Sequence, residues 1–158
     1  MDSSAMTLLT TRTVVYLQVI ESPQRMKLAA APGQRLPVFC TATGKGFLAF
    51  LSKETVEQIL KSGLPKYTEY TKTKRSAIFD ELEVIRERGF AISQQEYEEG
   101  VNAVAAPILD GKEYPVAAMA IVGPAFRLPQ ERLVELGKAV RVTADAIARD
   151  LGLAFRIA

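Results

Sequence analysis

Two apolar runs in the middle of the chain dominate its pattern of hydrophobic and polar positions. They cover residues 101–109 and 115–122, and Asp110 and Gly111 separate them. An Asp-Gly pair between runs rich in Val, Ile and Ala predicts a β-hairpin, because glycine accepts the positive φ that the turn requires. Many of the apolar side chains are alanines, so the two strands supply little volume of their own. Bulky side chains from helices, or a ligand, must fill the space above them.

A second hairpin is predicted closer to the N-terminus. Residues 13–20 are apolar and rich in β-branched side chains, residues 21–24 form a turn, and residues 25–30 return as a strand. Residues 90–94 are expected to form a further strand. Residues 1–12 lack a comparable pattern, and we expect a disordered start or linker remnant there.

Helices are expected where apolar residues recur at spacings of three and four. The pattern predicts them at residues 44–51, 52–62, 77–88 and 130–151. Thr41 or Thr43 is the expected N-cap of the first helix, and Gly89 ends the third. Because strands and helices mix without regular β-α-β alternation, residues 13–158 are expected to form one α+β domain with helices packed on an antiparallel sheet.

The composition is that of a globular protein with no strong charge bias. The chain has 158 residues, with 20 basic and 18 acidic side chains and a net charge of +2, so no global field attracts nucleic acid. No apolar run reaches the roughly 20 residues that span a bilayer, and the N-terminus lacks a secretory signal. The single cysteine, Cys40, excludes an internal disulfide. We therefore expect a cytoplasmic protein that does not bind membranes.

The chain contains no histidine, which excludes several classes of active site. Ser-His-Asp and Cys-His nucleophiles are absent, and so is the commonest zinc ligand. We therefore expect no metal and no cofactor. Carboxylates and lysines alone can still catalyse reactions, so an enzyme is disfavoured rather than excluded.

Polar side chains outside the strands admit two interpretations. Glu96, Glu98 and Glu99 could form paired carboxylates or a cation site, but without further ligands at regular spacing we expect a solvated acidic loop. The basic cluster at residues 72–75 is likewise expected to be solvated. Cys40 could be a reactive thiol, but with no activating histidine we expect a small buried hydrophobe.

Several short motifs follow one another in a characteristic order. Phe-Cys-Thr-Ala-Thr-Gly-Lys-Gly at residues 39–46 precedes the first helix, residues 83–89 end the third, and Val-Gly-Pro at residues 122–124 precedes the last. Between them, residues 96–101 lead into Ala-Ala-Pro-Ile at residues 105–108. In this order and spacing, the chain resembles the C-terminal effector-binding domain of the IclR family of bacterial transcriptional regulators over nearly its whole length.

The resemblance implies a fold and a function. It implies a GAF-like curved antiparallel sheet with helices on its faces, and a cleft for a small metabolite between the sheet and the loop before the first helix. Family members act as dimers or tetramers and carry a winged helix-turn-helix domain ahead of this module. The residues before the first predicted strand are too few for such a domain. The expected function is therefore effector sensing, with DNA bound through a domain absent from this chain.

The resemblance also implies which residues line the cleft. They come from the loop before the first helix, the strand at residues 90–94 and the central hairpin, with Met26 nearby: Cys40, Thr41, Ala42, Thr43, Gly44, Ser93, Ala103, Ala120 and Val122. The first N–H groups of a helix have no intrahelical acceptor, so residues 41–44 are the expected seat of a carboxylate. The alternative is that a threonine there caps the helix and contacts no ligand.

The side chains at these positions indicate the kind of ligand. Relatives that bind small acids place Asp, Cys or Ser where this chain has Ser93, Ala103, Ala120 and Val122. Each lost donor removes a contact worth about 1–3 kcal/mol in a desolvated pocket. The cleft is therefore expected to be apolar and roomy, and to take an aromatic or longer aliphatic carboxylic acid.

Other uses of the same space remain open at this point. Phe39, Phe47 or Phe90 could fill it, because apolar lining alone does not distinguish a pocket from a core. The domain would then be an oligomerisation module with a vestigial cavity. The remaining alternative is a carboxylate-using enzyme.

Overall fold

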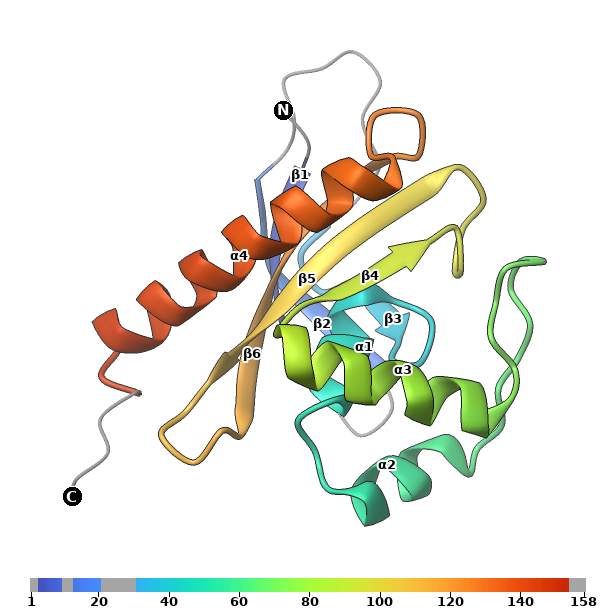
Figure 1. The fold of residues 1–158 in the computed structure, drawn as a ribbon, viewed down its shortest axis with the longest axis horizontal. Coiled ribbons are helices and arrows are strands. Elements are labelled where there is room, and N and C mark those ends of the chain that lie inside the picture. Colours follow the sequence, from blue (N-terminus) through green and yellow to red (C-terminus); the bar gives the residue numbers. More distant parts are fainter. Residues whose placement is uncertain (1–2, 10–12, 21–30, 154–158) are drawn as a thin grey trace.

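The computed structural model describes residues 3–9, 13–20 and 31–153 (Figure 1). Its strands form a 6-stranded sheet in the order β3-β2-β1-β6-β5-β4, and the pairings among the described residues are antiparallel. The strands are β1 (Ser3–Leu9), β2 (Thr13–Ile20), β3 (Arg35–Pro37), β4 (Ala91–Gln94), β5 (Val101–Leu109) and β6 (Pro115–Pro124). The N-terminal strand thus lies inside the sheet, between β2 and β6.

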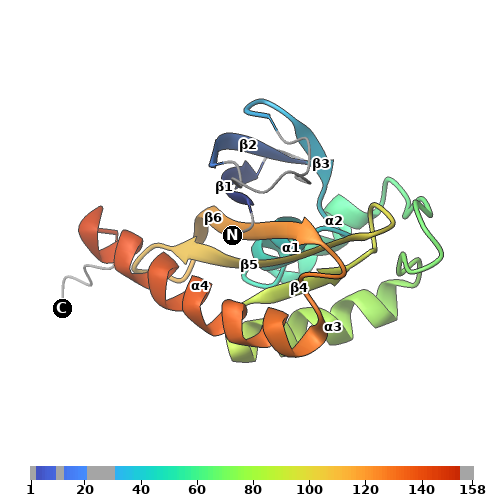
Figure 2. The same cartoon turned by 90° about the horizontal axis from the view of Figure 1, so that it is seen from above.

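Helices cover both faces of this sheet. They are α1 (Ala42–Leu48), α2 (Lys53–Leu60), α3 (Arg75–Arg88) and α4 (Gln130–Asp150). α1 packs on one face, where it also contacts α3, whereas α4 packs on β4, β5 and β6 from the other face. Figure 2 shows β1, β2 and β3 curving away from the layer of α4. The predicted α+β fold, a curved antiparallel sheet with helices on its faces, is confirmed.

Most of the predicted elements lie where the sequence pattern places them. β2 has the predicted bounds, and α3 ends at Gly89, whose φ of 84° is left-handed. α2 begins after Ser52, whose side chain accepts a hydrogen bond from the Thr55 N–H. β3 is 3 residues long and has no periodic signal in the sequence. No helix of the described residues is long and apolar enough to cross a lipid bilayer.

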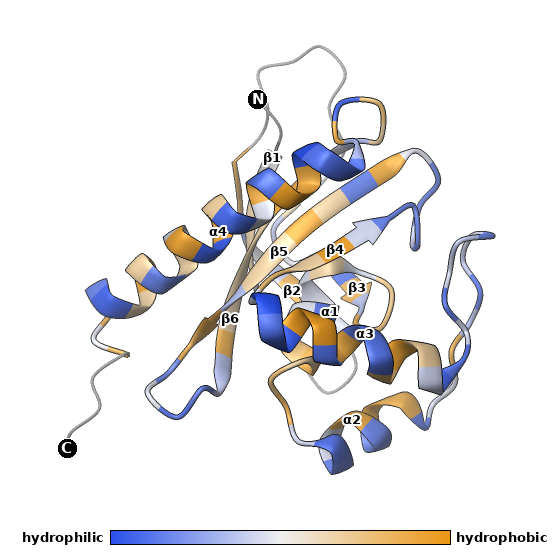
Figure 3. Ribbon diagram, viewed as in Figure 1, coloured by the Kyte–Doolittle hydropathy of each residue, from blue (hydrophilic) through white to orange (hydrophobic). Residues whose placement is uncertain are grey.

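Alternate residues of the β5–β6 hairpin point to the two helical faces. Ala105 pairs with Ala120, and both pack against Ala42 at the start of α1. On the opposite face, Val104 and Ile108 pack with apolar positions of α4, which recur along that helix between polar ones (Figure 3). The small side chains of the hairpin therefore let α1 approach the sheet closely.

The segment before α1 crosses the start of that helix at very short range. A Cβ atom built on Gly44 would lie 2.1 Å from the Val38 carbonyl oxygen and 2.3 Å from the Val38 Cα. Only glycine fits at this position, because any side chain would overlap the backbone. Thr41 caps the helix as predicted: its Oγ1 accepts a hydrogen bond from the Gly44 N–H at 3.2 Å.

The prediction of a disordered start is wrong for residues 3–9. β1 pairs with β2 on one side and with β6 on the other, so that Ala5 lies opposite both Val19 and Ala120. Residues 3–7 show no apolar alternation, and hydrogen bonds to two neighbouring strands stabilise the segment instead. The strand predicted at residues 25–30 lies outside the described residues.

The turn of the central hairpin is organised differently from the prediction. The positive φ falls on Glu113, at 61°, and not on Gly111. Asp110 Oδ1 accepts hydrogen bonds from the N–H groups of Lys112 at 2.8 Å and Tyr114 at 2.9 Å. The hairpin is therefore confirmed, but the aspartate side chain shapes its turn, and the role predicted for the glycine is wrong.

Candidate functional site

A cavity of about 80 Å³ lies between the start of α1 and the β5–β6 hairpin. β4 and the loop after it form another wall, and β2 with the segment 34–36 closes the remaining side. The small side chains of the hairpin thus leave a space beside α1 that the helix does not fill.

Most of the residues predicted to line the cleft surround this cavity. They are Thr41, Ala42, Thr43, Ser93, Ala103, Ala120 and Val122. Cys40 and Gly44 are not among its lining residues. The Cys40 side chain is fully buried in the core, and Gly44 lies against the backbone of Val38. Met26 lies outside the described residues.

Sequence reasoning missed the outer side of the cavity. Its lining residues there are Tyr16, Gln34, Leu36, Tyr97, Glu98 and Val101. Tyr16 shares a strand face with the buried Val14, which is a signal of period two that the sequence does carry. Tyr97 and Glu98 gave no such signal, because their positions depend on how the loop after β4 is held.

The hydroxyl groups around the cavity differ in what they bind. Thr41 Oγ1 donates to the Pro37 carbonyl oxygen at 2.6 Å, and Ser93 Oγ donates to the Cys40 carbonyl oxygen at 3.1 Å. Thr43 is only 4% exposed, and its hydroxyl makes no hydrogen bond within the described part of the chain. Thr43 is therefore the α1 hydroxyl that can donate to a ligand without breaking a contact of the protein.

Charge is scarce around the cavity. Among the described lining residues, Glu98 carries the one charged side chain, and it is exposed. Burial, with further contributions from Tyr97 and Glu98, raises the pKa of Tyr16 to about 12. The phenol therefore stays neutral near pH 7, and the described lining offers a ligand neutral donors rather than cations.

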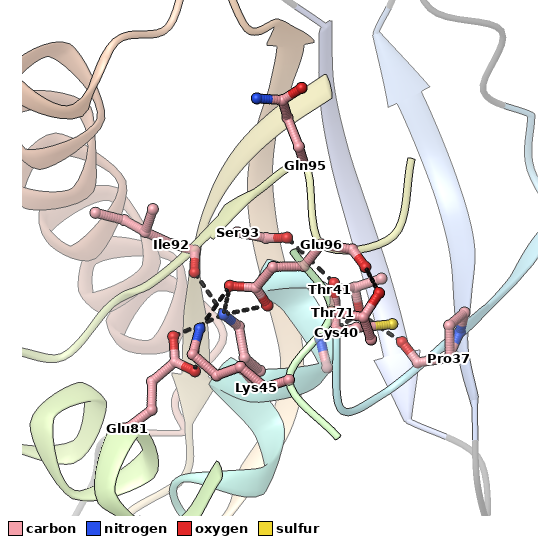
Figure 4. Close-up of polar contacts among 12 residues, drawn as sticks. Pro37, Cys40, Thr41, Lys45, Thr71, Glu81, Ile92, Ser93, Gln95 and Glu96 are labelled. Carbon is pink, nitrogen blue, oxygen red and sulfur yellow. Dashed lines mark hydrogen bonds and ion pairs between the residues drawn. The ribbon is translucent and has the colours of Figure 1, made fainter. Parts of the chain in front are cut away.

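A fully buried lysine lies behind the cavity wall. Lys45 Nζ, on α1, donates to the Ile92 carbonyl oxygen at 2.6 Å, to Glu81 Oε1 at 2.7 Å and to Glu96 Oε2 at 2.9 Å (Figure 4). Lys72 Nζ also contacts both carboxylates, Glu96 Oε1 at 3.0 Å and Glu81 Oε2 at 3.2 Å. We call these side chains, Lys45, Lys72, Glu81 and Glu96, the Lys45 network. It joins α1, α3, the segment before α3 and the loop after β4.

The Lys45 network corrects two predictions from the sequence. Glu96 is 5% exposed and ion-paired, so the expectation of a solvated acidic loop is wrong at this position. It is correct for Glu98 and Glu99, which are exposed. Lys72 is half-buried and pairs with two carboxylates, so it is not a freely solvated cation. Two lysines balance two glutamates, which is why these charges can lie inside the domain.

We expect the stability of the domain to fall in acid through Glu81. Burial alone would raise its pKa, but Lys45 and Lys72 outweigh burial and hold the pKa of Glu81 below its ordinary value of 4.5. A carboxyl with a lowered folded-state pKa contributes stability above its unfolded-state pKa and loses it as the pH falls through the folded-state pKa. The free energy of unfolding should therefore decrease below about pH 4.5.

Urea denaturation of the wild type and Glu81→Gln, followed by circular dichroism from about pH 7 to pH 3, measures this contribution. The variant should lose less stability than the wild type over the acid range. Glu87→Gln, at an exposed position of the same helix, should keep the wild-type pH dependence. Equal acid slopes in the wild type and Glu81→Gln would contradict the assignment.

Neither the phenylalanines nor the cysteine occupy the cavity. Phe47 is fully buried in the core around α1, and Phe90 packs under α4 beside Gly137. Phe39 contacts the Tyr67 ring, with centroids 6.2 Å apart. Among the described residues no phenylalanine lines the space, so that alternative is wrong. Burial and the Glu96 carboxylate raise the pKa of Cys40 to about 12, which keeps the thiol protonated.

Comparison with known proteins identifies the family. The family model described as bacterial transcriptional regulator IclR C-terminal matches residues 2–149. The chain belongs to the IclR family. It corresponds to the C-terminal effector-binding domain of that family, as the motifs indicated.

Individual relatives agree with the family assignment. The IclR-family domain is 34% identical over 140 residues to the HTH-type transcriptional repressor AllR of Escherichia coli, and the match covers 88% of this chain and 52% of that protein. The chain thus spans about half the length of the curated relatives it matches. These relatives are transcriptional repressors, not enzymes.

Solved structures of transcriptional regulators share the fold. The crystal structure of Thermotoga maritima IclR superposes with a TM-score of 0.89 at 32% identity, over 96% of this chain and 62% of that one. A double mutant of the PobR inducer-binding domain from Acinetobacter, in complex with 3-hydroxybenzoic acid, superposes with a TM-score of 0.83 at 27% identity. That match covers 95% of this chain and 89% of the PobR chain.

Proposed function

We propose that this domain senses an aromatic or longer aliphatic carboxylic acid in the cavity between α1 and the β5–β6 hairpin. The observation that carries the proposal is the pairing of an apolar floor with an unused hydroxyl. Ala103, Ala120 and Val122 form the floor, and Thr43 lies at the start of α1. The body of the acid packs on the floor, and its carboxylate accepts a hydrogen bond from Thr43.

Two further observations support this class of ligand. The described lining supplies hydroxyl groups but no lysine or arginine, so much of the binding energy must come from the apolar body of the ligand. An acid with a larger apolar part therefore binds better than a small, highly polar one. The double mutant of the PobR domain, which has the same fold, was solved in complex with the aromatic 3-hydroxybenzoic acid.

The sensing domain acts on DNA binding through the arrangement of its oligomer. In this proposal, a winged helix-turn-helix domain outside this chain binds the operator, and the effector-binding domains associate as dimers or tetramers. The acid binds one arrangement of the subunits more tightly than another and shifts the population toward it. Its effect on DNA affinity cannot exceed the ratio of these two affinities.

A titration with candidate acids tests the proposal. Benzoates, phenylacetates and medium-chain fatty acids are each added to the protein, and unfolding is followed by differential scanning fluorimetry. An acid that occupies the cavity should stabilise the folded state by about 2.7 kcal/mol at a hundredfold excess over its dissociation constant. If no acid stabilises the protein, the small volume of about 80 Å³ favours the alternative of an oligomerisation module with a vestigial cavity.

We expect Ala103→Leu to abolish most of this stabilisation. Ala103 is half-buried and lines the cavity, so the added side-chain carbons occupy the space of the ligand. The affinity for the best acid should fall by at least about tenfold, as isothermal titration calorimetry can measure. Ala139→Leu is the matched control, because Ala139 lies exposed on α4. An affinity unchanged in Ala103→Leu would place the acid elsewhere.

A further inference from the structure

A second, larger cavity lies beside the first. It has a volume of about 350 Å³ and lies between the β3 segment and the end of α2, where Val38, Ile59, Leu60 and Pro65 supply apolar walls. Among the described residues, Leu36 and Tyr97 line both cavities. Leu36 is buried in the core. Tyr97 is half-buried, so of the two residues between the cavities it is the one that can be replaced with the smaller loss of core packing.

Among the described residues, the Tyr97 side chain packs against the core and against another aromatic ring, and it makes no hydrogen bond. It meets the Tyr67 ring edge-on, with centroids 5.0 Å apart and an interplanar angle of 68°. Tyr67 lines the second cavity and is 45% exposed. An aromatic pair of this kind contributes about 0.5–1.5 kcal/mol beyond its buried area, which helps to hold the ring between the two cavities.

The backbone just before Tyr97 is held by hydrogen bonds. Thr68 Oγ1 donates to the Gln95 carbonyl oxygen and Thr71 Oγ1 to the Glu96 carbonyl oxygen, each at 2.6 Å. The Glu96 carboxylate is anchored in the Lys45 network, and Figure 4 shows Thr71 and Lys45 converging on Glu96 from two sides. Removing the Tyr97 side chain should therefore open the partition without moving the loop.

We propose that Tyr97 determines the length of the ligand, as a partition between the effector cavity and the second cavity. The inference rests on the proposed function, and it assigns the occupant of the second cavity as the tail of a long-chain or arylalkyl carboxylic acid. With the ring in place, a tail that outgrows the first cavity meets Tyr97. With the ring removed, the tail continues onto the apolar walls of the second cavity.

A series of straight-chain acids from butanoate to decanoate tests the partition by isothermal titration calorimetry on the wild type, Tyr97→Phe and Tyr97→Ala. In the wild type the gain in affinity per methylene should stop at the length at which the tail reaches the ring. In Tyr97→Ala it should continue, at about fourfold for each methylene buried. Tyr97→Phe keeps the ring and should keep the wild-type length limit. Tyr70→Ala should also keep it, because Tyr70 is not among the lining residues of either cavity.

The outcomes distinguish a failure of the Tyr97 proposal from a failure of the proposed acid-sensing function. If the wild type binds acids and Tyr97→Ala shows the same length limit, the partition is wrong and the function stands. If neither protein binds any acid, both are overturned. If Tyr97→Ala does not fold, as urea denaturation shows, Tyr97→Val removes the ring with a smaller loss of packing, and a longer limit in that variant supports the proposal. An unchanged limit in Tyr97→Val overturns it.

Discussion

Replacing Lys45 with methionine is expected to destabilise the domain by about 3–5 kcal/mol. Methionine matches most of the lysine in volume but leaves Glu81 and Glu96, which is 5% exposed, with Lys72 as the one cation of the network, so one negative charge is uncompensated. It also removes the hydrogen bond to the Ile92 carbonyl oxygen, at 2.6 Å. An uncompensated buried charge costs more than the ion pair itself contributes. Urea denaturation at neutral pH measures the loss.

Two further variants show whether losing the positive charge of Lys45 causes the loss of stability. Lys61→Met removes a lysine at an exposed position after α2 and should change the stability by no more than about 0.5 kcal/mol. Adding Glu96→Gln to Lys45→Met should recover part of the loss, since a neutral amide needs no cation. If the double variant is less stable than Lys45→Met, the loss comes from packing and not from the excess negative charge of the network.

Replacing Gly44 with alanine should cost more than about 4 kcal/mol and leave little folded protein. The new Cβ would lie 2.1 Å from a backbone oxygen of Val38, and backbone cannot move aside as a flexible side chain does. The segment before α1 would have to separate from the helix, which opens the core around Cys40. Yield of soluble protein and thermal unfolding measure the effect.

Gly46→Ala is the matched control on the same helix. Its Cβ would meet Pro107 Cδ at 3.7 Å, an ordinary van der Waals contact. Alanine also has the better helix propensity, by about 1 kcal/mol. Gly46→Ala should therefore fold at least as well as the wild type. Equal stability of the two variants would show that the approach of Val38 to α1 is not rigid.

The parts of the fold that the sequence predicts are those that depend on local pattern. The central hairpin, β2 and α3 with its glycine cap follow from side-chain periodicity and turn residues within each segment. β1 could not be predicted in this way, because its stability comes from pairing with β2 and β6. Pairing with a strand more than a hundred positions away leaves no mark on the residues of β1.

The residues of the candidate site also fall into those that local motifs indicate and those whose positions depend on distant partners. The motifs indicated the start of α1 and the hairpin floor, since these segments carry distinctive small residues. They did not indicate the burial of Lys45, whose partners Glu81 and Glu96 are 36 and 51 positions away. A lysine in a run of small polar residues is ordinarily exposed. Its burial is decided by carboxylates that the fold brings to it.

The position of β1 inside the sheet affects how the domain folds while it is being synthesised. Ser4 lies opposite Ile121, so the first strand of this domain finds its partner β6 only when most of the domain has emerged from the ribosome. Contacts of such sequence separation slow folding, because a long loop must close before they form. Until then the β6-facing edge of β1 is unpaired in the nascent chain, and an unpaired strand edge favours aggregation. β1 can therefore pair with β2 early, but its other edge stays unpaired until β6 has been synthesised.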